Sequence, residues 1–139
     1  MTSSEPGVEV RALIAGHGDF AAGAISAVHQ ISGLGARFHP LSNAGLDAAA
    51  IDFTLRTLLD KTGALVIFTD LPAGSCTLAA RRIARDRPGL AVVTGANVAM
   101  LLDFAFQDDV GAAAAAQAAA RGREAILVAA PPPEVPRAG

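Results

Sequence analysis

The sequence contains no tryptophan, no tyrosine and a single cysteine, and its net charge is only −2. With Cys76 alone, no internal disulfide can form, which suits a reducing compartment such as the cytoplasm. A nucleic-acid partner needs a basic surface and rings on which bases stack, and this chain has neither. No apolar run reaches the roughly 18 to 20 residues of a membrane span, so we expect no insertion into a membrane.

The two ends differ in composition from the rest of the chain. Residues 1–7 contain glutamate and proline where an export signal needs a basic start and an apolar centre, so we expect a disordered N-terminus on a cytoplasmic protein. Residues 131–139, "PPPEVPRAG", predict a flexible proline-rich tail. Residues 8–130 are long and apolar enough to form one domain with a real core.

Short apolar runs alternate with helical patterns through this domain. Four runs predict β-strands, at residues 8–15, 36–41, 64–70 and 90–95. Apolar side chains at helical spacing predict helices at 20–32, 46–61, 75–86 and 97–106, an alanine-rich segment predicts another at 112–125, and "ILVAA" (126–130) predicts a last strand. This order predicts an α/β fold: a mostly parallel, doubly wound sheet of four strands with helices on both faces.

Several polar residues fall where predicted strands end. In a parallel sheet the functional site lies at the carboxyl ends of the strands. His17 follows the first strand, Asp70 ends the third, and Ser75 is expected to N-cap the helix after it, as Asn97 is expected to open helix 97–106. If the first and third strands are neighbours, their separation of about 5 Å brings Asp70 within reach of His17.

The segment "GHGDFA", residues 16–21, allows other interpretations. It fits the pattern G-x-G-x-x-G/A that binds dinucleotides between a strand and a helix. That site also requires a carboxylate about 20 positions on, and "RFHPLSN" contains none. His17 could also be an ordinary loop histidine. We favour a site in which the imidazole itself reacts, and keep a nucleotide-binding module as the alternative.

Three segments carry a family resemblance: "IAGHGDFAAG", "FTDLPAGSCTLAARRI" and "VVTGANVAMLLDF". Together they resemble the enzyme IIA component of the mannose-type phosphotransferase system, most closely its N-acetylgalactosamine-like branch, over about Val10 to Val128. The resemblance implies a cytoplasmic phosphotransferase that takes a phosphoryl group from the phosphocarrier HPr onto a histidine and passes it to a IIB component in sugar uptake. It implies no cofactor and no metal. A regulatory IIA, whose phosphorylation state signals without sugar transport, is the alternative within the family.

The resemblance also assigns residues. It makes His17 the phosphoryl acceptor and Asp70 the residue that orients it, and it places Gly18, Gly74 and Ser75 around the phosphoryl group. The chemistry agrees, because a carboxylate at one ring nitrogen sets the tautomer and leaves the other nitrogen free to attack. His29, within a predicted helix, is expected to be a surface or boundary residue. His39, beside Pro40 at a strand end, is expected to be structural, and Cys76 is expected to be a packed or idle cysteine.

The last predicted strand suggests a homodimer. Residues 126–130 follow a polyalanine helix, which is a poor cover for a sheet edge, and an exposed apolar edge strand promotes aggregation. A two-fold partner could accept the strand. The resemblance implies the same arrangement, a dimer with exchanged C-terminal strands that run antiparallel at the sheet edge. A monomer whose last strand folds back on its own sheet is the alternative.

Overall fold

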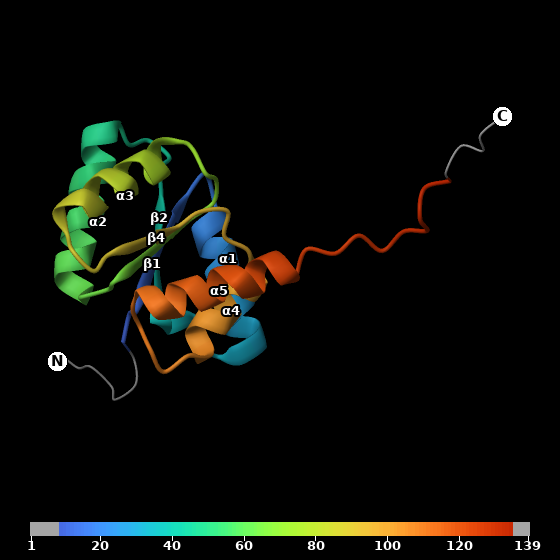
Figure 1. Cartoon of the computed structure of the whole chain (residues 1–139). Coiled ribbons are helices and arrows are strands. Elements are labelled where there is room, and N and C mark those ends of the chain that lie inside the picture. The colour runs from blue at the N-terminus through green and yellow to red at the C-terminus, as the bar shows by residue number, and fades with distance from the viewer. Residues whose placement is uncertain (1–8, 135–139) are drawn as a thin grey trace.

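A parallel sheet with helices on both faces forms the body of the computed structural model, which describes residues 9–134 (Figure 1). The strands are β1 (Ala12–Gly16), β2 (Phe38–Ser42), β3 (Val66–Thr69) and β4 (Ala91–Val93), in the order β2-β1-β3-β4. All three neighbouring pairs are parallel. The predicted doubly wound sheet is confirmed, and β1 and β3 are neighbours. The N-terminal residues 1–7, expected to be disordered, lie outside the described residues.

The helices cover the two faces of the sheet unequally. They are α1 (Phe20–Ser32), α2 (Ala48–Thr62), α3 (Ser75–Asp86), α4 (Val98–Phe106) and α5 (Ala112–Glu124), with a short 3₁₀ turn η1 (Gly35–Arg37) before β2. Helices α1, α4 and α5 pack on one face, and α2 and α3 on the other (Figure 1). The predicted bounds of α1 and α3 are confirmed, and those of the other three helices differ from the observed ones by one or two residues. Among residues 9–134, no helix has the length and apolar character needed to cross a membrane.

The two central strands explain the apolar runs of the sequence. Every residue of β1 and β3 is buried, because helices cover these strands on both sides. On one face Phe68 packs edge-on against Phe104, with ring centroids 5.2 Å apart, and Phe38 packs beside both. The edge strand β2 tolerates Pro40 because an edge residue can lack its outward N–H. The result is a rigid platform whose carboxyl edge carries the loops.

The helix caps confirm one prediction and correct another. Asn97 caps α4, since its side chain accepts a hydrogen bond from the backbone N–H of Met100 at 2.9 Å. Ser75 is not the N-cap of α3. The cap is Gly74, at φ +106° and ψ 169°, and Ser75 is the first helical residue. The chain enters α3 through a backbone conformation that glycine alone adopts readily, so the cap falls on the glycine.

The expected antiparallel edge strand is wrong for the single chain. Residues 126–130 form no strand, and the segment after α5 extends away from the body (Figure 1). Ile126, Leu127 and Val128 are 72%, 84% and 88% exposed. The alternative in which this segment folds back on its own sheet is therefore also wrong. A strand forms only against a partner with free backbone groups, and within one chain the segment does not reach such an edge.

Candidate functional site

The carboxyl ends of β1 and β3 bring His17 and Asp70 together. The register pairs Ala15 with Thr69, so the residues just beyond both strands meet at one edge of the sheet. Oδ2 of Asp70 accepts a hydrogen bond from the backbone N–H of His17 at 2.9 Å and lies 2.8 Å from Nδ1 of the ring. One carboxylate oxygen therefore holds both the backbone and the imidazole of His17.

Gly16 provides the space for this contact. A Cβ at position 16 would lie 2.9 Å from both Cγ and Oδ2 of Asp70, which is closer than real Cβ contacts come. The glycine that ends β1 thus lets the carboxylate approach the residue after it. Gly16, the first of the two glycines that flank His17, therefore has a role in the contact between Asp70 and His17, and this role does not involve a dinucleotide.

The electrostatics of the pair favour an ionised carboxylate. Burial raises the pKa of Asp70, but hydrogen bonds from the backbone N–H and the ring of His17 outweigh it, so the pKa lies below its ordinary value of 3.8. The Asp70 side chain is only 12% exposed, whereas that of His17 is 50% exposed. At neutral pH the carboxylate is thus charged and can accept a proton from Nδ1. In the neutral imidazole of that tautomer, Nε2 carries the lone pair.

The start of α3 faces the other side of the ring. A Cβ on Gly74 would lie 3.2 Å from Cε1 and 3.7 Å from Nε2 of His17. No side chain caps α3, so the N–H groups of its first turn remain available for an anion next to Nε2. Ser75 stands in this turn. Gly18, at φ +52°, follows His17 and faces open space.

Sequence reasoning missed Asn43, which lies between the predicted strand 36–41 and the predicted helix 46–61. Nδ2 of Asn43 donates to Oγ of Ser75 at 3.3 Å. The residue directly follows β2, and β2 lies beside β1, so it sits at the same carboxyl edge as His17 and Asp70. That position is the signal that could have identified it, because polar residues that end neighbouring parallel strands converge.

The other candidate groups lie outside this cluster. Nδ1 of His29 accepts from the backbone N–H of Gly35 at 3.3 Å, and Nδ1 of His39 lies 3.0 Å from the carbonyl oxygen of Pro40. Cys76 is buried, and burial, reinforced by the charge of Asp70, raises the pKa of its thiol. It is therefore protonated at neutral pH and packs as a small apolar side chain.

The alternative of a nucleotide site gains no support from the residues after β2. A ribose would need a carboxylate at the end of that strand. The first acid after β2 is Asp47, and it caps α2 by accepting from the backbone N–H of Ala50 at 2.8 Å. The carboxylate that does reach the loop after β1 is Asp70, and it holds His17.

Comparison with known proteins identifies a family. The EIIA-man family model, described as the PTS system fructose IIA component, matches residues 11–121. No curated protein sequence matches the chain. Among solved structures, the mannose/sorbose specific IIA subunit of the phosphotransferase system from Enterococcus faecalis is similar, with 20% identity and a TM-score of 0.77 over 91% of this chain and 99% of that one.

Two further structures share the fold. A putative phosphoenolpyruvate-dependent sugar phosphotransferase system permease from Klebsiella pneumoniae has 23% identity and a TM-score of 0.70 over 91% of this chain and 96% of that chain. The phosphotransferase system component EIIA from Streptococcus agalactiae has 18% identity and a TM-score of 0.77 over 86% and 96%. At these identities the structures establish the fold, and the family model covers most of the chain. The chain belongs to the EIIA-man family, the IIA components that carry phosphoryl groups in sugar uptake by the phosphotransferase system.

Proposed function

We propose that His17 accepts a phosphoryl group from HPr on Nε2 and passes it to a IIB component. The observation that carries the proposal is the 2.8 Å contact between Nδ1 of His17 and Oδ2 of Asp70. Because that contact occupies Nδ1, the nitrogen left for attack is Nε2, and the His17 side chain is half exposed. We place this exchange in the cytoplasm, where the family's partners meet.

The transfer step balances without any further reactant. The lone pair of Nε2 forms a bond to phosphorus while the phosphorus–nitrogen bond to the donor's histidine breaks, and its electron pair stays on the donor ring. His17 becomes cationic as the new bond forms, and the charge of Asp70 stabilises that cation through Nδ1–H. Transfer to the IIB component is the same step with His17 as the leaving group.

The start of α3 is the proposed cradle for the phosphoryl oxygens. Its first-turn N–H groups and the hydroxyl of Ser75 are donors that follow Gly74, at which an added Cβ would lie 3.7 Å from Nε2, and helix N-termini favour anions. Gly18 is the further residue proposed for this cradle, since it follows His17 at the entrance to α1. The N-acetylgalactosamine-like branch stays a prediction that rests on the three sequence segments.

The direct test uses the purified chain with enzyme I, HPr and phosphoenolpyruvate. Intact-mass analysis is expected to show the addition of one phosphoryl group, and addition of a matching IIB component is expected to remove it. A nucleotide-binding module would behave differently: it would bind a nucleotide in calorimetry and gain no mass from HPr. That result would overturn the proposal.

Replacement of Gly74 by alanine is expected to slow phosphoryl transfer roughly tenfold, because the new methyl group presses on Cε1 of His17 and displaces the ring. The positive φ should also cost about 1–3 kcal/mol of stability. The matched control is Gly89→Ala, since Gly89 has φ +92° but no atom near a new Cβ. G89A should lose stability and keep the transfer rate in stopped-flow assays; equal rates for the two variants would contradict this contact.

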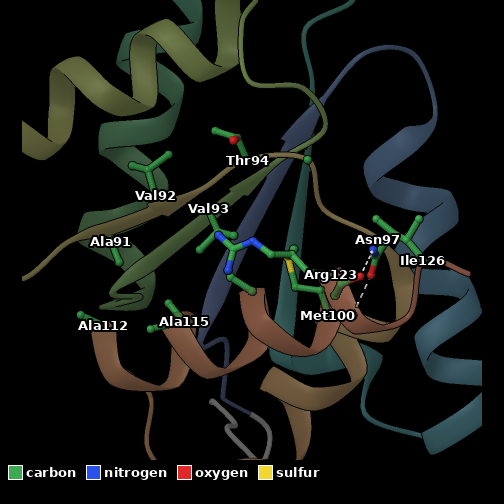
Figure 2. A pocket seen from close by; sticks show the side chains of 14 residues that line it. Ala91, Val92, Val93, Thr94, Asn97, Met100, Ala112, Ala115, Arg123 and Ile126 are labelled. Atoms are coloured by element: carbon green, nitrogen blue, oxygen red, sulfur yellow. Dashed lines mark hydrogen bonds between the residues drawn. The ribbon is translucent and has the colours of Figure 1, made fainter.

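We further propose that two copies of the chain exchange residues 126–130. The open edge of β4 borders a hollow of about 430 Å³ between β4 and α5. Figure 2 shows Arg123 extending from α5 toward β4, with Ile126 at the far end of the same hollow. Three consecutive apolar side chains of the segment are more than 70% exposed in the single chain, and a strand edge is the surface that such a segment pairs with.

Light scattering should therefore report a mass near twice the 14.0 kDa of one chain. Truncation after Arg123 removes the segment and should reduce the mass to that of a monomer. Truncation after Ala130 is the matched control, because it removes only the tail and should leave the dimer intact. If the shorter chain stays dimeric and as stable as the intact one, residues 126–130 do not link the two copies.

A further inference from the structure

Both backbone polar groups of Asn43, its N–H and its carbonyl, are hydrogen-bonded at the carboxyl edge of the sheet. Its N–H donates to the carbonyl oxygen of Gly16, the residue before His17, at 3.0 Å. Its own carbonyl oxygen accepts from the backbone N–H of Leu46, also at 3.0 Å. The backbone of Asn43 is thus tied to the strand that leads into His17, and the side chain starts from a defined point.

The side chain of Asn43 crosses from the end of β2 to the start of α3. Nδ2 donates to Oγ of Ser75 at 3.3 Å, and both residues are half-buried. Ser75 follows Gly74, the position that faces Cε1 and Nε2 of His17. The amide therefore connects the strand beside His17 to the helix start that faces the reacting nitrogen.

This hydrogen bond restricts the direction of the Ser75 hydroxyl proton. A hydroxyl group has one proton and two lone pairs, and Asn43 occupies a lone pair of Ser75, so the proton must point elsewhere. Within residues 9–134 no hydrogen bond takes up that proton. The neighbouring hydroxyl of Thr77 differs, because it donates to the carbonyl oxygen of Leu71 at 2.6 Å.

We infer that Asn43 is a positioning residue: its amide holds the Ser75 hydroxyl as a donor toward a phosphoryl oxygen on Nε2 of His17. The inference rests on the proposed phosphorylation of His17 and goes beyond it by naming the residue that orients the cradle. Asn43 acts through Ser75, so removing either side chain removes the same hydrogen bond to the phosphoryl group.

The test loads His17 with phosphoramidate, a small donor that needs no partner protein. The phosphorus–nitrogen bond of phosphoramidate breaks, a bond to Nε2 forms, and ammonia leaves. The pKa of the phosphoryl group is then read from a pH titration of its ³¹P resonance. A donated hydrogen bond favours the dianion, so its loss should raise this pKa by about one unit, a tenfold change in the acid constant.

Asn43→Ala and Ser75→Ala should each give this rise, and the double variant should give no more than either alone. Asn43→Asp keeps the size of the side chain and serves as a second variant in case alanine disturbs the turn. The change that it causes in the phosphoryl pKa should be smaller in the S75A background than in the wild type. Asn97→Ala is the matched control, because Asn97 also follows a strand but caps α4; it should leave the pKa unchanged.

The outcomes separate this inference from the proposed function. A phosphoryl pKa in N43A equal to that of the wild type would overturn the positioning role. So would a rise caused by N43A that is as large in the S75A background as in the wild type, because a merely structural residue acts independently of the serine. If phosphoramidate loads His17 and the variants behave as expected while HPr does not phosphorylate it, the inference stands and the donor assignment fails. If phosphoramidate does not load His17, phosphorylated HPr loads it for the same titration; if neither donor loads His17, both fail.

Discussion

Replacement of His17 by alanine is expected to abolish phosphorylation by enzyme I, HPr and phosphoenolpyruvate. The reason is that the proposed acceptor atom is Nε2, and alanine offers no nucleophile in its place. In the wild-type chain, intact-mass analysis should show one added phosphoryl group, and acid should remove it, because a phosphorus–nitrogen bond is labile once the ring is protonated. The variant should show no added mass at any time point.

The two other histidines are the natural controls for this result. The ring of His29 is exposed on α1 and accepts from the backbone of Gly35, and the ring of His39 contacts the backbone of Pro40. Neither has a carboxylate partner within residues 9–134. His29→Ala and His39→Ala should therefore be phosphorylated as the wild type is. Retained phosphorylation of His17→Ala would end the hypothesis that this residue is the acceptor.

The central strands and the main contact of the site could be predicted from the sequence for the same physical reason. Strands buried on both faces must be apolar throughout, so "ALVIFTD" marks β3 without reference to the rest of the fold. Polar residues directly after such strands converge at one edge, which brings Asp70 to His17 once β1 and β3 are neighbours. The local sequence pattern and the strand order together are enough to predict the contact between Asp70 and His17.

Features that depend on distant partners could not be predicted in this way. The bond from Asn43 to Ser75 joins residues 32 positions apart, and it requires the relative placement of β2 and α3. The cap of α3 depends on the backbone angle at Gly74, which the preference of serine for N-caps does not reveal. The strand expected at 126–130 needs the edge of a sheet, and within the single chain the segment does not pair with the open edge of β4.

Replacement of Asp70 by asparagine is expected to slow phosphoryl transfer to His17 by roughly 10²- to 10⁴-fold. The amide has nearly the shape of the carboxylate, and its oxygen can still accept from the backbone N–H of His17, so the fold should survive. It carries no charge, however, and cannot stabilise the imidazolium that forms as Nε2 attacks. It also no longer enforces a proton on Nδ1, so the reactive tautomer is less populated. Rapid-quench measurements with phosphorylated HPr give the rate.

Asp19→Asn is the matched control for this variant. Asp19 lies at the N-cap of α1, two residues from His17, and its side chain makes no capping hydrogen bond, so D19N removes a nearby negative charge without touching the ring. It should transfer phosphoryl groups at close to the wild-type rate. A D70N variant that matched the wild type would show that the contact at 2.8 Å contributes nothing to transfer.

The stability of D70N against pH tests the same contact without any partner protein. Because the pKa of Asp70 in the folded chain is below its ordinary value of 3.8, the ionised carboxylate stabilises the fold above that pH, and the contribution disappears as pH falls through the folded pKa. Wild type should therefore unfold at a higher temperature than D70N near neutral pH, and the difference should shrink steadily below pH 3.8. A difference that persisted unchanged into acid would mean that the asparagine perturbs packing, and slow transfer in that variant could then not be assigned to the lost charge.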